Sequence, residues 1–131
     1  MPQFSQRSLD RLATCHADLQ AVFHAVIRQV DCTILEGHRT KQGQDAAFAA
    51  GKSKLRWPDG KHNTLPSRAV DAAPWPIDWQ DRDRFHLFGG IVLGIAHSQG
   101  VALRWGGDWD GDFVLRDNRF DDLVHFELKD G

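Results

Sequence analysis

Two histidines and an aspartate stand out because together they could hold a metal ion. His125 lies in a short apolar run near the C-terminus, while His62 and Asp71 are separated by eight residues in the middle of the chain. Two imidazoles and one carboxylate form a ligand set that suits Zn²⁺ and leaves a fourth coordination position open for water. An open position is typical of catalytic zinc, so these residues favour a hydrolase.

Length and charge limit the other functions. The 131 residues suit one compact domain with a substantial hydrophobic core, and we expect residues 1–131 to form a single catalytic domain. The 16 basic and 18 acidic residues are well mixed, for a formal net charge of −2. This balance predicts neither nucleic-acid binding nor electrostatic attraction to a membrane.

The N-terminal region shows no pattern for export or membrane insertion. Polar residues interrupt every apolar run before position 21, and no stretch approaches the ~20 apolar residues of a membrane span. Only Cys15 and Cys32 are present, too few for a disulfide framework or a thiolate metal site. We therefore expect a protein without a signal peptide that is made in a reduced compartment. If its substrate lies outside the cytoplasm, something else must release it, and a monomer is the default expectation.

Hydrophobic spacing predicts about three helices. Apolar residues recur at helical spacing over Ser8–Val30, with a break near Thr14. A second helix is expected over Thr40–Ala50 and a third over Asp78–Gly100, where Thr40 and Asp78 would be the N-caps.

Short β-prone runs predict the strands that lie between and after these helices. They are Cys32–Leu35, Arg68–Ala73, Val101–Trp105 and Leu123–Leu128, with long loops at 52–67 and 106–121. The last strand would place His125 and Glu127 on the same face. The order of elements predicts an α+β fold, in which about three helices pack against a small, largely antiparallel sheet.

A series of short motifs then links the candidate residues. In chain order these are Gly37-His38-Arg39-Thr40, Gln44, Gly51-Lys52-Ser53, Gly60-Lys61-His62, Arg68-Ala69-Val70-Asp71, Trp105-Gly106-Gly107-Asp108-Trp109 and Asp122-Leu123-Val124-His125-Phe126-Glu127. The series resembles zinc peptidases of the D-Ala-D-Ala carboxypeptidase and dipeptidase type, in particular the phage L-alanyl-D-glutamate endolysins. The resemblance covers about residues 33–128 and implies a Hedgehog/DD-peptidase-like fold.

This resemblance assigns roles to five residues. It implies His62, Asp71 and His125 as zinc ligands, which agrees with their chemistry. It implies Asp122 as the general base that takes a proton from the attacking water and passes it to the leaving amine. It also implies that Arg39 binds substrate and stabilises charge on the attacked carbonyl.

Other residues receive supporting roles. Gln44, Ser53 and Trp109 are expected to line the substrate cleft, and Glu127 to orient a ligand or bind substrate. Asp121 is the fallback for the base, and Glu127 is a second one.

The chain departs from the family pattern at three points. The His-to-Asp spacer has eight residues where six is commoner, Gly60 stands where Ser is usual, and Val124 stands where Pro is frequent. A loop insertion accounts for the spacer, and none of the departures removes a metal ligand.

The segment Asp108–Asp112 resembles the opening of a calcium-binding loop. The twelfth position, which should carry a bidentate Glu, is Arg119. We therefore do not expect a standard EF-hand.

Together the residues and the resemblance predict a zinc metallopeptidase that hydrolyses a bond in peptidoglycan stem peptides. An L-alanyl-D-glutamate endopeptidase, acting as a phage endolysin in host lysis, is the leading hypothesis. One alternative is a D-Ala-D-Ala carboxypeptidase or dipeptidase on the same scaffold, and another is a cell-wall-binding module that has lost catalysis.

Overall fold

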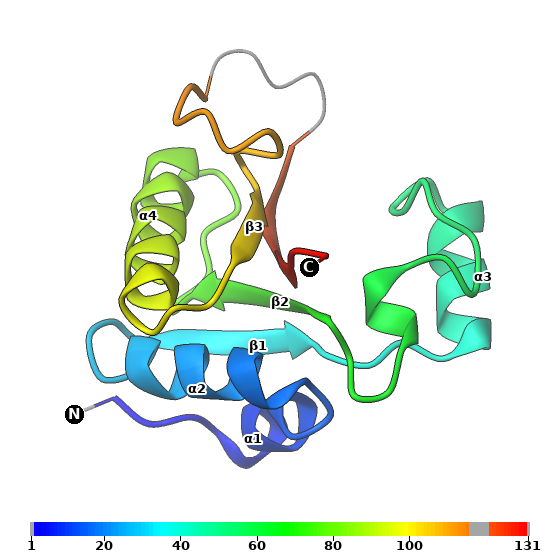
Figure 1. The fold of residues 1–131 in the computed structure, drawn as a ribbon, viewed down its shortest axis with the longest axis horizontal. Coiled ribbons are helices and arrows are strands. Elements are labelled where there is room, and N and C mark those ends of the chain that lie inside the picture. Colours follow the sequence, from blue (N-terminus) through cyan, green and yellow to red (C-terminus); the bar gives the residue numbers. More distant parts are fainter. Residues whose placement is uncertain (1, 116–120, 131) are drawn as a thin grey trace.

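A four-stranded antiparallel sheet forms the centre of the protein, with strand order β1-β2-β4-β3 (Figure 1). The computed structural model describes residues 2–115 and 121–130. Its elements are α1 (Gln6–Leu12), α2 (Ala17–Val26), β1 (Cys32–Glu36), α3 (Lys41–Ala49), the 3₁₀ helix η1 (Lys61–Asn63), β2 (Ala69–Pro74), α4 (Arg82–Ser98), β3 (Leu103–Gly106) and β4 (Asp122–Leu128). The predicted α+β class with an antiparallel sheet is confirmed.

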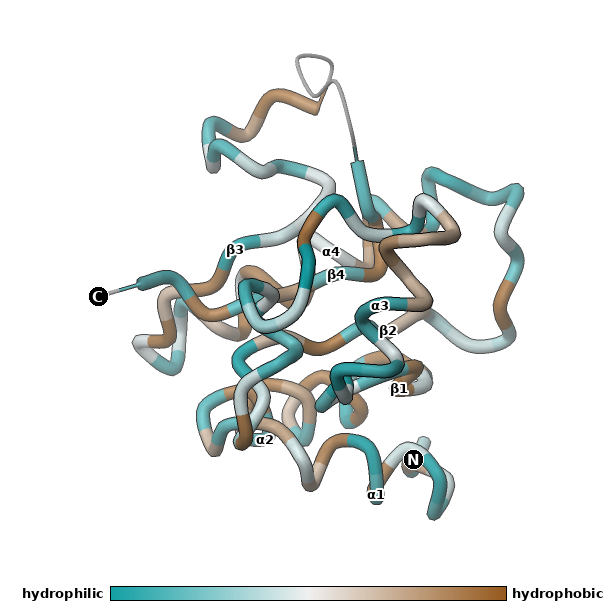
Figure 2. The backbone as a smooth tube through the Cα atoms, turned by 90° about the vertical axis from the view of Figure 1, so that its right-hand side faces the viewer, coloured by the Kyte–Doolittle hydropathy of each residue, from teal (hydrophilic) through white to brown (hydrophobic). Residues whose placement is uncertain are grey.

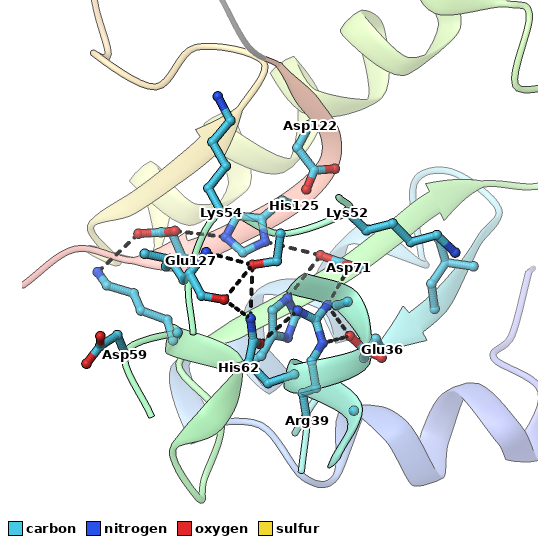
Figure 3. A pocket seen from close by; sticks show the side chains of 18 of the residues that line it. Glu36, Arg39, Lys52, Lys54, Asp59, His62, Asp71, Asp122, His125 and Glu127 are labelled. Atoms are coloured by element: carbon cyan, nitrogen blue, oxygen red, sulfur yellow. Dashed lines mark hydrogen bonds and ion pairs between the residues drawn. The ribbon is translucent and has the colours of Figure 1, made fainter. Parts of the chain in front are cut away.

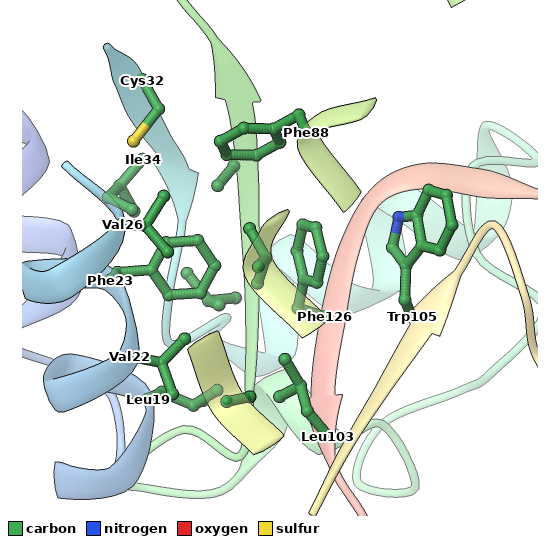
Figure 4. Close-up of a cluster of buried hydrophobic side chains, with 14 of the residues drawn as sticks. Leu19, Val22, Phe23, Val26, Cys32, Ile34, Phe88, Leu103, Trp105 and Phe126 are labelled. Atoms are coloured by element: carbon green, nitrogen blue, oxygen red, sulfur yellow. The ribbon is translucent and has the colours of Figure 1, made fainter. Parts of the chain in front are cut away.

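The hydrophobic core lies between the sheet and the helices α2 and α4 (Figure 4). Phe126 of β4 is fully buried, and its ring meets Phe23 of α2 and Phe88 of α4 edge to face, with centroids 5.6 and 6.1 Å apart. These contacts remove large apolar rings from water, at roughly 25 cal/mol per Å² of apolar area. Both helices are thereby fixed on one face of the sheet, which leaves the other face for chemistry.

Two of the predicted helix boundaries differ in the structure. The region predicted as one helix with a break is two separate helices, α1 and α2, and α2 begins after the N-cap His16. The third helix begins at Arg82, because the side chain of Asp81 accepts a hydrogen bond from Arg84 N. The prediction of Asp78 as the N-cap of this helix is therefore wrong. Its carboxylate instead accepts from Gln80 N in a turn that precedes the helix.

Helix α3 lies apart from the other helices, beyond the ends of β1 and β2 (Figure 1). Gln44 is its one buried residue, and much of the helix is hydrophilic (Figure 2). Thr40 caps it as predicted, since its hydroxyl accepts from Gly43 N. Residues 51–60 continue from α3 as a loop, so this part of the chain forms a wall that faces the sheet.

Two expectations about cysteines and membranes can be compared with the structure. Cys15 and Cys32 are both buried and unbridged. Across residues 2–115 and 121–130, no helix has the length and apolarity that a bilayer crossing requires.

Glycine inside α4 has a packing reason at one position only. A Cβ on Gly89 would lie 2.3 Å from the indole ring of Trp105, whereas a Cβ on Gly90 would meet nothing within 4 Å. Trp105 is itself fixed, because its Nε1 donates to Leu123 O at 2.9 Å. The small residue at 89 therefore allows α4 to pack against β3.

We predict that Gly89→Ala destabilises the protein by about 1–3 kcal/mol through overpacking against Trp105. The matched change Gly90→Ala should stabilise it by about 0.5–1 kcal/mol, since alanine favours the helix and no clash arises. Urea denaturation of both variants measures the difference. Equal effects at the two positions would contradict the packing account.

Candidate active site

The three predicted ligand residues meet at one point beside the sheet (Figure 3). Asp71 Oδ1 lies 3.2 Å from His62 Nε2 and 3.2 Å from His125 Nδ1. One ligand atom from each residue lies within 4.8 Å of the other two. The structure therefore brings together side chains that come from η1, β2 and β4.

Strand register accounts for two of these positions. Asp71 of β2 pairs with His125 of β4, and Glu36 of β1 pairs with Asp71 on its other side. Directly paired residues of antiparallel strands place their side chains on the same face. Glu36, Asp71 and His125 consequently form a row across three strands, and His62 completes the cluster from outside the sheet.

The histidine ring nitrogens are surrounded by acceptor oxygens. His62 Nδ1 lies 2.7 Å from Gly37 O, and His125 Nε2 lies 2.8 Å from Glu127 Oε1. These oxygens and Asp71 Oδ1 can only accept, so a charged imidazole donates from both of its nitrogens. A neutral imidazole that keeps its proton on the nitrogen facing Gly37 or Glu127 directs its lone pair toward Asp71. A cation placed between them would relieve the repulsion that results.

The spacing of these atoms fits zinc. Tetrahedral coordination with bonds of about 2.0–2.1 Å separates neighbouring ligand atoms by roughly 3.3 Å. The two separations of 3.2 Å from Asp71 Oδ1 agree with that value. The outer partners Gly37 and Glu127 also match the usual arrangement, in which the second nitrogen of a ligand histidine donates to a carbonyl or carboxylate.

Without a metal, the cluster is a strongly coupled group of charges. Burial alone would lower the pKa of His125, but hydrogen bonds with Asp71 and Glu127 outweigh it and raise this pKa to about 9. Burial would raise the pKa of Asp71, yet hydrogen bonds from His125 and His62 hold it well below its usual range. The metal-free site is thus filled by ion pairs that a metal ion would have to replace.

Close packing fixes the carbonyl that orients His62. A Cβ on Gly37 would lie 2.4 Å from both Arg11 O and Thr14 Oγ1, so only glycine fits there. The Cα of Gly37 therefore lies directly against the end of α1, while its carbonyl faces His62. The peptide that follows is also held, because His38 N donates to Thr14 Oγ1 at 2.8 Å.

Arg39 lies beside the cluster and is held firmly. Its guanidinium donates to Glu36 Oε1 and, at 3.1 Å, to Gln44 Oε1. Its Nη2 is 3.8 Å from Asp71 Oδ2. A cation is therefore fixed at the edge of the site, with the fork of donors that suits an anionic oxygen.

Gln44 is buried, at 1% exposure, and all of its hydrogen-bonding capacity is used within the protein. Its Oε1 accepts from Arg39 and Asn63, and its Nε2 donates to Ser53 Oγ at 3.0 Å and Leu55 O at 2.6 Å. The amide thus joins Arg39, η1 and the loop that follows α3. This arrangement favours a structural role for Gln44 over the substrate contact expected from the sequence, and Ser53 remains half-exposed at the cleft.

The two adjacent aspartates at the start of β4 have different surroundings. Asp121 Oδ2 lies 2.5 Å from Arg82 Nη2 at the start of α4. Asp122 lies over the cluster (Figure 3), and burial together with the charge of Asp71 raises its pKa. A carboxyl with a raised pKa accepts a proton more readily near neutral pH, so Asp122 is the better placed base.

The cluster lies at the bottom of an open cleft of about 1420 Å³. Trp109 forms part of its wall, with its ring 5.5 Å from the His125 ring and the Arg104 guanidinium 4.9 Å above it. α3 and the loop after it line the opposite side, including Ser53. A peptide chain could therefore pass between the sheet and the α3 wall.

A second acidic group lies at Asp108, Asp110 and Asp112, whose carboxylates approach within 4.8 Å. Asp108 is buried, and its Oδ1 has no hydrogen-bond partner. Arg119, which argued against an EF-hand, lies outside the described residues.

Sequence reasoning missed Glu36 and Asn63. Glu36 contacts Arg39 three residues later, and Asn63 donates to Gln44 Oε1 and accepts from Gly60 N. The spacing of Glu36 and Arg39 at the end of a strand was a usable signal. Asn63 gave none, because its partners depend on the short 3₁₀ turn.

The fold is shared with a solved structure of a bacterial endopeptidase. The crystal structure of Serratia marcescens L-Ala D-Glu endopeptidase ChiX is similar, with a TM-score of 0.76, 26% sequence identity, and coverage of 97% of this chain and 90% of that chain. No curated protein matches the chain significantly. The shared fold and the site together define an endopeptidase of the cell-wall type.

The family follows from a direct match. The family model for phage L-alanyl-D-glutamate peptidase covers residues 1–129. The chain belongs to this family and is an L-alanyl-D-glutamate peptidase that acts on peptidoglycan. The predicted L-alanyl-D-glutamate peptidase activity on peptidoglycan is thereby confirmed.

We predict that the metal-free protein loses stability as pH rises. The folded-state pKa of His125 is about 9, above its ordinary value of 6.5. The stabilisation is therefore complete below pH 6.5 and lost between pH 6.5 and 9. Urea denaturation in a chelator measures this loss, which His125→Gln should remove and the exposed control His97→Gln should keep. The same pH dependence in His125→Gln and wild type would refute the assignment.

Proposed function

We propose that this peptidase depends on a zinc ion held by His62, Asp71 and His125. One observation carries the proposal: both imidazoles direct a nitrogen at the same carboxylate oxygen, while their other nitrogens face acceptors. Zinc bound there would supply a Lewis acid and would lower the pKa of an attacking water to about 7.

The protein's own groups perform the proton transfers and stabilise charge. Asp122 takes the proton from the attacking water and gives it to the leaving amine, which its place over the cluster and its raised pKa support. Arg39 stabilises negative charge on the oxygen of the attacked carbonyl, and Glu36 and Gln44 keep its guanidinium in place. Glu127 orients His125.

The cleft would hold the stem peptide on both sides of the scissile bond. Trp109 offers a flat apolar surface next to His125, and Ser53 offers a hydroxyl on the opposite wall. Substrate binding is the role we assign to these two residues.

We also propose how the protein is used. Residues 1–131 act as a single, monomeric catalytic domain of a phage endolysin. It accumulates in the cytoplasm of the host bacterium, and a separate factor releases it to the wall at lysis. The family match supports the phage setting.

Removal of one ligand should lower metal occupancy. We expect His62→Ala to reduce bound zinc to well below one ion per chain, because two ligands hold zinc far more weakly than three. Elemental analysis after dialysis measures this, with His97→Ala as a control that removes an exposed histidine. Unchanged stoichiometry in His62→Ala would exclude that residue as a ligand.

Loss of the base should separate metal binding from catalysis. Asp122→Asn should keep its zinc but lose about 10²–10⁴-fold in kcat, the usual contribution of a general base. Asp121→Asn should stay near wild type, since Asp121 is paired with Arg82.

Mass analysis of muropeptides digested by wild type and both variants gives the readout. Wild type should release fragments that end in L-alanine. If Asp122→Asn were fully active, Asp122 would not be the base.

A further inference from the structure

The two histidines of the cluster come from elements that do not belong to the same sheet. His125 lies within β4, whereas His62 lies in η1, a helix of three residues inside a long loop. The distance between the imidazoles therefore depends on how η1 is fastened to β4. Lys61, next to His62, and Glu127, two residues after His125, supply this connection.

Lys61, which precedes His62, reaches across to the end of β4. Its Nζ lies 3.2 Å from Glu127 Oε2, donates to Leu128 O and lies 3.4 Å from Asp130 Oδ1. The Lys61 side chain is 22% exposed and that of Glu127 is 11% exposed. The ammonium is thus held by three oxygen atoms of the C-terminal segment.

Glu127 links Lys61 to the cluster, because it contacts both Lys61 and His125. Its Oε2 faces Lys61, and its Oε1 accepts the hydrogen bond from His125 Nε2 at 2.8 Å. Arg104 Nη1 is a more distant cation, 3.9 Å from Oε2. Among the lysines and arginines of the described residues, Lys61 is therefore the nearest to a buried carboxylate that is bonded directly to a proposed ligand.

We propose that Lys61 is a positioning residue of this peptidase, which holds the Glu127 carboxylate against His125 and, through that carboxylate, fixes the position of η1 relative to His125. The inference rests on the proposed zinc function, because its effect is on the geometry of the ligands. Lys61 touches neither the metal position nor the reacting atoms, so it acts through Glu127.

Burial separates this pair from ordinary surface ion pairs. Lys41 and Asp45 lie at a similar distance, 2.9 Å, but their side chains are 69% and 53% exposed. Exposed pairs of this kind contribute little. Loss of one partner from a mostly buried pair leaves an uncompensated charge. Lys41→Met is thus a matched control for Lys61→Met.

The test is a double-mutant cycle on zinc affinity, measured by competition with a chromogenic chelator. Lys61→Met should weaken zinc binding by up to about 10-fold, the lower end of the effect of losing a direct outer partner of a ligand, because Lys61 acts one contact further out than Glu127. Lys61→Arg should recover most of the loss, and Lys41→Met should match wild type. With Glu127→Gln already present, Lys61→Met should add no further loss, since the path through Glu127 is already broken.

Kinetics on purified peptidoglycan fragments provide a second readout. If Lys61 positions ligands and does not contact substrate, Lys61→Met should lower kcat at fixed zinc saturation and leave KM unchanged. A raised KM with normal kcat would instead make Lys61 a substrate contact and overturn the proposal.

Three further results would overturn it. If Lys61→Met bound zinc as tightly as wild type, Lys61 would have no positioning role, although the proposed metal site itself would still stand. Losses that multiply in the Lys61→Met/Glu127→Gln double variant would show that Lys61 does not act through Glu127. Absence of zinc binding in wild type would refute the proposed function itself, and the role of Lys61 with it.

Discussion

The site depends on a single carboxylate oxygen that two imidazoles share. Asp71 Oδ1 is 3.2 Å from a nitrogen of His62 and 3.2 Å from a nitrogen of His125. Three largely buried polar groups at such distances are costly unless each has a partner of opposite character. The rest of the structure provides those partners: a glycine carbonyl behind one ring, a carboxylate behind the other, and a guanidinium beside the aspartate.

The sheet and the core make this arrangement rigid. β2 and β4 are the interior strands, and their register places Asp71 opposite His125. On the other face, Phe126 is locked between α2 and α4, so the neighbouring residue His125 cannot shift without disturbing the core. Packing on one face of a strand thus fixes chemistry on the other face, as the alternation of side chains requires.

The sequence predicted those parts that depend on local patterns and on recognisable motifs. Alternation and helical spacing identified the strands and helices, and the motifs singled out His62, Asp71 and His125, which the structure brings together. The parts that it did not predict depend on contacts between distant segments. Glu36 becomes significant only when β1 pairs with β2, and Asn63 only when η1 meets Gln44.

The N-cap of α4 also depends on contacts that the local sequence pattern does not predict. Asp78, Asp81 and Asp83 are all acceptable near a helix N-terminus, and sequence alone gave no reason to choose Asp81. The choice is made by tertiary contacts, because the Arg84 side chain binds the carbonyls of Trp75 and Pro76 and holds the preceding turn against the helix.

Strand order carries a consequence for when the enzyme becomes competent. β4 is made after β1, β2 and β3, yet it is inserted between β2 and β3. A nascent or truncated polypeptide without β4 lacks the strand that joins β2 to β3, and it lacks His125 as well. We therefore expect neither the complete sheet nor the cluster around Asp71 to form until β4 has been made.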